Sequence, residues 1–80
     1  MNADFEKTIG QNIRKLRLEA GMTQDDLSTK LQLHNCDITR SALAKIEVGQ
    51  RHIYVDELCA LKEILHVSYE IILTPHSYDE

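Results

Sequence analysis

The sequence predicts an all-α domain of five helices, and three observations support this class. The 80 residues include a single proline and three glycines, a composition typical of helices joined by short turns. Apolar residues recur every three or four positions near the N-terminus, in the stripe Phe5, Ile9, Ile13, Leu16 and Ala20. A chain of this length holds one hydrophobic core, so we expect a single domain over residues 1–75 and a flexible C-terminal tail over residues 76–80.

The first two helices have local start and stop signals. A helix from about Asp4 to Ala20 carries the apolar stripe, and Gly21 follows it as a residue able to adopt positive φ. Thr23 then caps a second helix, with Asp26 three positions later completing a shortened capping box. Leu27 and Leu31 lie one turn apart on its buried side, and we expect it to end at residue 32 or 33.

Three shorter helices complete the prediction. Asp37 or Thr39 begins the third, and Gly49 ends it. The fourth begins near residue 55 or 56, and the fifth covers residues 69–73, between a capping serine and Pro75. We expect the fourth helix to bury Leu58, Leu61 and Leu65, with Cys59 and Ile64 widening its apolar face.

The composition excludes several classes of protein. Hydrophobic residues make up 42% and charged residues 28% of the chain, as in ordinary soluble domains. No apolar run approaches the roughly 18 residues of a membrane span, and the N-terminus does not resemble a secretory signal, so we expect a cytoplasmic protein. Two cysteines are too few for a disulfide scaffold. We expect Cys59 to be buried between apolar neighbours and Cys36, in a polar stretch, to be exposed.

Charge is distributed unevenly along the chain. The net charge is −4, yet residues 1–53 have a balance of +1 and residues 54–80 a balance of −5. A surface that faces phosphates must therefore come from the first two thirds of the chain. The basic footprint over a whole domain that is typical of simple electrostatic binding to nucleic acid is absent.

The third predicted helix presents polar side chains on the side opposite its apolar edge. With about 100° per residue, Ser41 and Lys45 lie opposite Leu43, and Arg40 reaches forward from the first turn. A helix that enters the major groove of DNA leads with its N-terminal residues, and arginine is the usual reader of guanine. Thr39 and Gln24 stand at helix starts, where phosphate contacts are common. The same pattern suits a solvated face of a plain helical interaction module equally well.

Arg17 and Glu47 form a second pattern. Each borders the apolar stripe of its own predicted helix, where a lone charge would be half-buried and costly. We expect the two to form an ion pair that joins the first helix to the third and sets the pose of Arg40 and Lys45. The alternative is that both are surface side chains with buried stems.

With these residues in place, the chain resembles the Cro/phage-repressor type of helix-turn-helix protein, also called the XRE family. The resemblance covers about residues 5–74. It rests on Ile9-Gly10, Ile13-Arg14, Leu16-Arg17, Gly21-Met22-Thr23-Gln24, Asp26-Leu27, Leu31, Leu43, Lys45-Ile46-Glu47, Gly49, Leu58, Leu61, Leu65, Val67-Ser68 and Ile72-Leu73.

The resemblance implies a compact five-helix, lambda-repressor-like domain in which the second and third helices form the helix-turn-helix unit. It implies phosphate contacts from Gln24 and Thr39, and base contacts from Arg40, Ser41 and Lys45. It also implies backbone contacts from Gln50 and Arg51, and a structural ion pair between Arg17 and Glu47. Family members usually regulate transcription as homodimers on double-stranded operators of two-fold symmetry, without a cofactor.

The chain departs from the family pattern in its turn. Seven residues separate Leu31 from Thr39, where the family has about two or three and an ordinary turn of this motif about 3–4. The insertion over residues 32–38 could extend the second helix, bulge toward the phosphates or change the angle of the third helix. The connector also lacks the proline that is common after Arg51.

The leading hypothesis is a homodimeric, sequence-specific DNA-binding regulator, expected to be a repressor. The alternative is a protein-binding module such as an antitoxin or adaptor. No catalytic spacing or phosphate-binding glycine loop predicts an enzyme. His34, Cys36, Cys59 and His66 are poorly spaced for a metal or redox sensor. We expect dimerisation through residues 69–73 and the end of the fourth helix, where Tyr69, Ile71, Ile72 and Leu73 gather; these four could instead close the core.

Overall fold

A computed structural model describes residues 3–75 and contains five α-helices. In chain order these are α1 (Ala3–Glu19), α2 (Gln24–Leu33), α3 (Arg40–Glu47), α4 (Val55–Leu65) and α5 (Tyr69–Leu73). No strand occurs between residues 3 and 75, so the predicted all-α class and the five helices are confirmed. The expected tail over 76–80 lies outside the described residues. None of the described helices is long and apolar enough to cross a membrane.

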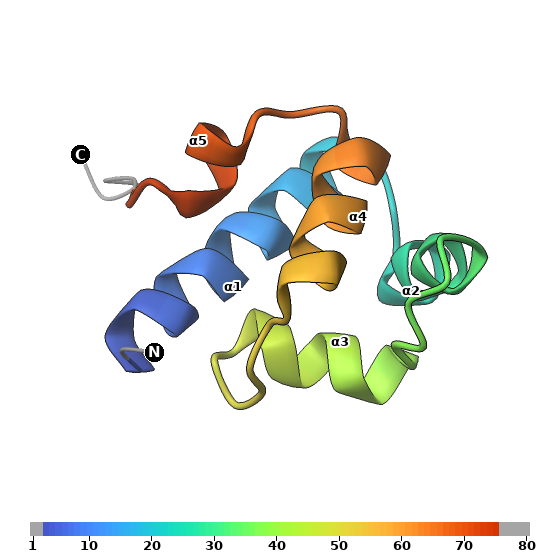
Figure 1. The fold of residues 1–80 in the computed structure, drawn as a ribbon, viewed down its shortest axis with the longest axis horizontal. Coiled ribbons are helices and arrows are strands. Elements are labelled where there is room, and N and C mark those ends of the chain that lie inside the picture. Colours follow the sequence, from blue (N-terminus) through green and yellow to red (C-terminus); the bar gives the residue numbers. More distant parts are fainter. Residues whose placement is uncertain (1–2, 76–80) are drawn as a thin grey trace.

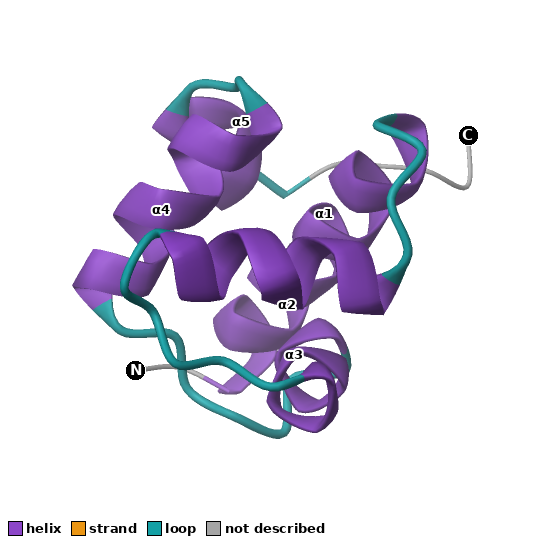
Figure 2. Ribbon diagram, turned by 90° about the vertical axis from the view of Figure 1, so that its right-hand side faces the viewer, coloured by secondary structure: helices purple, strands orange, loops and turns teal. Residues whose placement is uncertain are grey.

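The two longest helices, α1 and α4, lie side by side, and the three shorter helices pack around them (Figure 1). α1 packs against α3, α4 and α5, and α2 packs against α3 and α4. Figure 1 shows α1 and α4 side by side, with α5 across one end and α3 across the other. Figure 1 shows α2 nearly end-on, and Figure 2, turned by 90°, shows α3 nearly end-on. The axes of these two helices therefore cross steeply. A steep crossing of two consecutive helices is the geometry of a helix-turn-helix.

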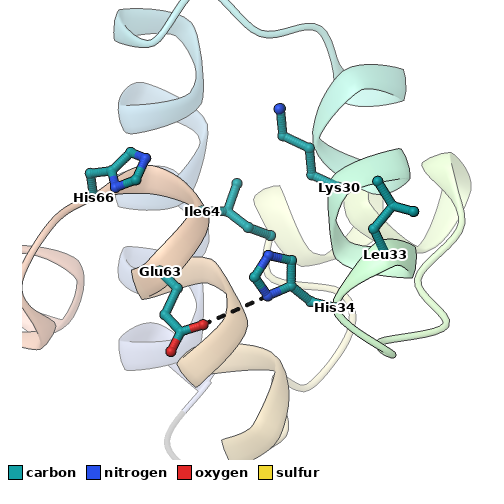
Figure 3. A pocket seen from close by; sticks show the side chains of 6 residues that line it. All are labelled: Lys30, Leu33, His34, Glu63, Ile64 and His66. Carbon is teal, nitrogen blue, oxygen red and sulfur yellow. Dashed lines mark ion pairs between the residues drawn. The ribbon is translucent and has the colours of Figure 1, made fainter.

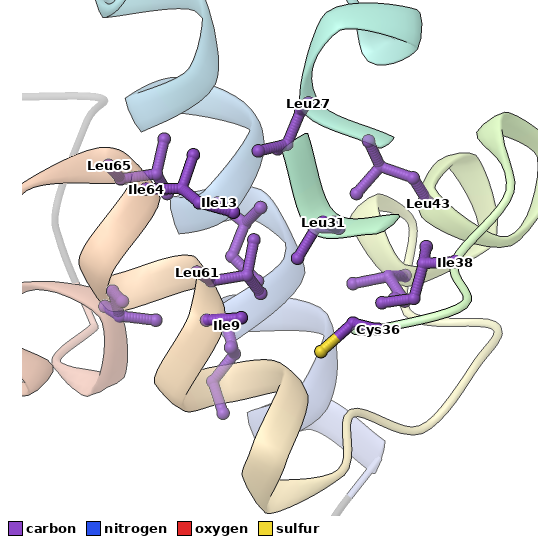
Figure 4. Close-up of a cluster of buried hydrophobic side chains, with 13 residues drawn as sticks. Ile9, Ile13, Leu27, Leu31, Cys36, Ile38, Leu43, Leu61, Ile64 and Leu65 are labelled. Atoms are coloured by element: carbon purple, nitrogen blue, oxygen red, sulfur yellow. The ribbon is translucent and has the colours of Figure 1, made fainter. Parts of the chain in front are cut away.

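The core is aliphatic, and every helix contributes to it. The fully buried side chains include Ile13, Leu27, Leu31, Ile38, Leu43, Ile46, Leu61 and Ile72 (Figure 4). Of the apolar stripe predicted for α1, Ile9 and Ile13 are buried, but Phe5 is 37% exposed. Branched aliphatic side chains in fixed packing hold the short helices in a single arrangement.

Side-chain caps begin three of the helices, as the sequence predicts. The Thr23 hydroxyl accepts a hydrogen bond from the Asp26 N–H at 3.0 Å, and the Asp26 carboxylate accepts one from the Thr23 N–H at 2.9 Å. Thr39, rather than Asp37, caps α3 by accepting from the Ala42 N–H at 3.2 Å. Ser68 caps α5 in the same way. These caps fix where α2 and α3 begin.

The insertion over residues 32–38 folds toward the core. Asn35 adopts positive φ of 66° after the end of α2, and the Cys36 N–H then donates to the Leu31 carbonyl at 2.9 Å. This is the Schellman arrangement that satisfies the last carbonyls of a helix. Ile38 is fully buried, and the Gln32 side chain donates to its carbonyl at 3.1 Å. Cys36 and Ile38 therefore anchor the insertion to the core ahead of α3, while its other five residues are exposed.

Both cysteine predictions are wrong. Cys36 is 5% exposed and points into the cluster around Leu31 and Leu61 (Figure 4), because the turn after α2 directs it inward. Cys59 is exposed, because α4 buries Glu57, Ala60, Leu61, Ile64 and Leu65 and turns the opposite side outward. Leu58, expected to be buried on that helix, is only partly buried against the core. In both cases the neighbours in the chain were a poor guide to burial.

Asn12 ties the C-terminal segment to α1. Its side-chain amide donates to the carbonyl of Ile72 at 2.8 Å and to that of Thr74 at 2.9 Å, although Asn12 itself is 1% exposed. A buried amide is stable only when its polar atoms are paired. Asn12 thus fixes α5 against the face of α1 that lies away from α3.

Candidate nucleic-acid interface

A buried ion pair joins α1 to the end of α3. The Arg17 Nε atom lies 2.7 Å from Oε2 of Glu47, and Nη2 lies 3.1 Å from Oε1, so the pair is bidentate. The two side chains are 7% and 1% exposed. The third nitrogen, Nη1, donates to the Met22 carbonyl at 2.9 Å. Because all three guanidinium nitrogens have acceptors, the desolvation cost of both charges is compensated.

Gln24 extends this network to α2. Its side-chain Nε2 donates to Glu47 Oε1 at 3.1 Å, so the first residue of α2 is bonded to the last residue of α3. Glu47 therefore accepts hydrogen bonds from two different helices. The relative position of α1, α2 and α3 is fixed by one carboxylate.

Gly10 allows α1 and α3 to approach closely. A Cβ atom at this position would overlap the backbone carbonyl oxygen of Ile46. Gly10 is itself buried in the middle of α1. A larger residue would push α3 away from α1, so the glycine is needed for the contact rather than for its backbone conformation.

The residues expected to contact DNA lie on the outer side of α3. Leu43 and Ile46 are fully buried, whereas Arg40, Ser41 and Lys45 are exposed. Thr39, the cap of this helix, is exposed as well. The structure therefore places the polar side of α3 toward solvent, with its N-terminal turn free of covering elements among residues 3–75.

Gln24 and Arg40 lie at the rim of a shared depression. The hollow measures about 490 Å³ and is lined by residues from the end of α1, the turn that follows it, the start of α2 and the start of α3. Thr23 and Asp25 also line it. Asp25 Oδ1 lies 3.9 Å from Arg40 Nε, a contact that the sequence analysis missed because the two residues are far apart in the chain. Of the predicted contact residues, Gln24 and Arg40 thus line one hollow, whereas Thr39 and Ser41 do not line it.

The connector after α3 is more constrained than expected. Gln50 is exposed, but Arg51 has its guanidinium bonded to Glu57, with Nη1–Oε1 at 2.9 Å and Nη2–Oε2 at 3.1 Å. The side chain of Arg51 is only 27% exposed. Burial alone would raise the pKa of Glu57, but hydrogen bonds from Arg51 and from the Tyr54 N–H outweigh it, so the pKa lies below its ordinary value.

A second acid holds the connector to α1. Oε2 of Glu6, a buried residue in the first turns of α1, lies 2.7 Å from Nδ1 of His52. The connector is therefore anchored through His52 to α1 and through Arg51 to α4. Neither contact was predicted, because charges in the sequence give no sign of a partner in a distant segment.

A separate depression lies between the C-terminal ends of α2 and α4. It measures about 340 Å³ and is lined by Lys30, Leu33, His34, Glu63, Ile64 and His66 (Figure 3). His34 Nδ1 lies 3.7 Å from Glu63 Oε2, and His66 stands apart on the other side of Glu63. Within residues 3–75 no group of three or more potential metal ligands comes together. None of the residues that line this hollow belongs to α3.

The proteins and families to which the chain is similar agree with this architecture. A family model described as helix-turn-helix matches residues 13–72. The chain is 31% identical over 72 residues to an uncharacterized HTH-type transcriptional regulator, y4dJ, of Sinorhizobium fredii, covering 90% of this chain and 87% of that protein. No solved structure matches the chain. The matched region includes the whole of α2, α3 and α4, and both residues of the buried pair that joins α1 to α3. The chain belongs to the Cro/C1-type (XRE) helix-turn-helix family of DNA-binding transcriptional regulators, with its lambda-repressor-like fold.

Proposed function

We propose that this protein is a sequence-specific transcriptional repressor that binds an operator of two-fold symmetry as a homodimer and reads the major groove with α3. The observation that carries the proposal is the exposed polar side of α3 on a rigidly held helix. Arg40, Ser41 and Lys45 face solvent, while the opposite side is fixed by Leu43, Ile46 and the Arg17–Glu47 pair. Reading DNA requires such rigid placement.

The roles of the individual residues follow from their places. Arg40 and Ser41, in the first turn of α3, are proposed to contact base edges together with Lys45 one turn later. Thr39 and Gln24, at the starts of α3 and α2, are proposed to contact phosphates. Gln24 can do so with its backbone N–H or its second amide hydrogen, because only one side-chain contact ties it to Glu47.

The connector is proposed to contact the DNA backbone through Gln50 and Arg51. Gln50 is exposed and free to do so. Arg51 would approach a phosphate while bonded to Glu57, so its contribution is smaller than that of a freely exposed arginine. A charge-assisted pair holds its guanidinium at the surface, and the phosphate would add a further acceptor.

The homodimer is proposed to form through α5 and the start of α4. Tyr69 and Ile71 are 39% and 41% exposed, whereas Ile72 is fully buried and Leu73 packs on the core. Close to α5, Val55 is 78% exposed, and a narrow apolar groove of about 140 Å³ runs beside Phe5, Leu58 and Leu73. The expected contribution from the end of α4 is less favourable, because Glu63 and His66 are exposed there.

The function is tested by selecting duplexes from a random DNA library with the purified protein, followed by binding measurements on the selected duplex. We expect a motif with two inverted half-sites, because a two-fold dimer presents two copies of α3. A stoichiometric protein partner together with no selected motif at low salt would instead favour a protein-binding module.

The dimer is tested by sedimentation equilibrium on Ile71→Asp and Val55→Asp. Both changes place a charge on the proposed interface, and we expect them to yield monomers. Leu33→Asp is the matched control, since Leu33 is 79% exposed and belongs to α2 on another side of the molecule. A dimer that survives both Ile71→Asp and Val55→Asp places the interface elsewhere.

A further inference from the structure

Asp25 is an acid on a surface that would have to approach phosphates. It is the second residue of α2, and its side chain is 76% exposed. Its Oδ1 lies 3.9 Å from Nε of Arg40, whose own side chain is 67% exposed. An ion pair this long and this exposed contributes little to the stability of a fold. A carboxylate here also repels DNA phosphates and therefore lowers the affinity of the protein for DNA.

The contact uses one particular edge of the guanidinium. Asp25 Oδ1 approaches Nε of Arg40, at 3.9 Å. A bidentate contact with the O6 and N7 atoms of guanine needs two guanidinium nitrogens in one plane. The charge of Asp25 favours orientations of the Arg40 side chain that keep the guanidinium near this carboxylate, and a narrower range of orientations lowers the entropy lost when the base is bound.

Asp25 is itself held in place relative to α3. The capping box of Thr23 and Asp26 fixes the first turn of α2 on either side of Asp25. Gln24, the preceding residue, is bonded to Glu47 of α3. Asp25 and Arg40 also line the same depression. The carboxylate therefore stands at a defined place on a rigid element, as a positioning group requires.

We propose that Asp25 is a positioning and specificity-determining residue: it orients Arg40 toward a guanine in each half-site and disfavours DNA that lacks this base. On the correct site, the Arg40–guanine contact offsets the repulsion between Asp25 and the nearest phosphates. The repulsion acts on every sequence alike, so the discrimination comes from the Arg40–guanine contact that Asp25 orients. This inference rests on the proposed function, and it adds a role for an acid that neither helix capping nor the family pattern assigns.

The test compares Asp25→Asn with Asp4→Asn. Asp4 is also the second residue of its helix, is exposed, and lies at the start of α1, at the opposite end of the molecule from the first turn of α3 (Figure 1). Both changes raise the net charge by the same amount, so an effect of total charge appears in both. Each protein is used to select duplexes from a random library, and binding to the selected duplex and to a scrambled duplex is measured by fluorescence anisotropy at several salt concentrations.

We expect Asp25→Asn to bind the scrambled duplex severalfold more tightly and to lose about tenfold in discrimination at one guanine of each half-site. Arg40→Ala should lose preference at that same guanine, and the double variant should lose no more than Arg40→Ala alone. Asp4→Asn should keep the base preference of the unchanged protein, and Asp25→Glu should retain most of it.

Two results would overturn the inference. If Asp25→Asn selects the same motif with the same discrimination as Asp4→Asn, Asp25 does not position Arg40, and the proposed function stands without it. If the unchanged protein selects no motif at all, the proposed function fails and this inference fails with it. Thermal unfolding by circular dichroism, done on every variant, shows that a lost preference does not come from lost structure.

Discussion

Arg17 and Glu47 are 30 residues apart in the chain and form a bidentate ion pair in which both side chains are almost fully buried. The pair also binds Gln24 and the Met22 carbonyl, so α1, α2, α3 and the turn after α1 meet at two side chains. A buried pair with all its partners satisfied contributes orientation more than net stability. Here it sets the direction in which the exposed side of α3 points.

Breaking this pair from one side should be costly. Arg17→Met leaves Glu47 buried without its countercharge, and we expect a loss of about 3–5 kcal/mol in the free energy of unfolding. The double variant Arg17→Met, Glu47→Met should recover much of that loss, since neither charge then remains buried. Urea unfolding followed by circular dichroism measures all three proteins. Equal stability of the single variant and the unchanged protein would show that the pair does not form in solution.

Gly10→Ala should separate α1 from α3. The added methyl group would overlap the Ile46 carbonyl, and we expect a destabilisation of roughly 1–3 kcal/mol in spite of the better helix propensity of alanine. Gln11→Ala, one position along on the exposed side of the same helix, is the matched control and should change stability by less than about 0.5 kcal/mol. A gain in stability for Gly10→Ala would contradict the close approach.

The Glu57 carboxylate should make stability depend on pH on the acid side. Its pKa in the folded protein lies below the ordinary value of 4.5, because Arg51 and the Tyr54 N–H hold it ionised against the effect of burial. A lowered pKa contributes stability above pH of about 4.5, and that contribution is lost as the pH falls through the folded value. The free energy of unfolding, measured at several pH values from about 3 to 6, where carboxylates titrate, gives the dependence of stability on pH.

Two variants separate Glu57 from the other acids. Glu57→Gln should be less stable at neutral pH and should show a smaller loss on acidification. Glu63→Gln, on the same helix but with a side chain that is 67% exposed, should keep the full acid-side slope. The assignment fails if the two variants respond to acid alike.

The two thiols should differ in reactivity. Burial raises the pKa of Cys36, with nearby acids adding to the effect, and its thiol lies within the core. Cys59 is exposed on α4. A thiol reagent should therefore modify Cys59 rapidly in the native protein and Cys36 only on unfolding. Cys59→Ser should abolish the rapid phase; a rapid phase that persists would place Cys36 at the surface.

The helix starts could be predicted because they depend on neighbours in the chain. Thr23, Thr39 and Ser68 each bond to an N–H three positions later, and this pattern is visible in the sequence. The pairing of Arg17 with Glu47 could also be anticipated, because each charge borders an apolar stripe that had to be buried. These signals, with the apolar spacing, predicted the helices and the exposed side of α3, whereas the lambda-repressor-like arrangement was predicted from the family resemblance.

Contacts between distant segments could not be predicted. Nothing in the sequence indicates that Asn12 bonds to α5, that Arg51 faces Glu57 or that Asp25 approaches Arg40. The burial of Cys36 and the exposure of Cys59 were missed for a related reason. Burial depends on the direction in which a turn or a helix face points, and polar or apolar neighbours in the chain do not determine that direction.

The most direct test of the account is the binding of Arg40→Ala and Lys45→Ala to the duplex selected by the unchanged protein. Lys30→Ala, which removes one exposed positive charge from α2, is the matched control. We expect the two α3 variants to lose specific binding while keeping the helicity and melting temperature of the unchanged protein, and Lys30→Ala to bind as before. If Arg40→Ala and Lys45→Ala bind the selected duplex as tightly as Lys30→Ala does, the exposed side of α3 does not read DNA.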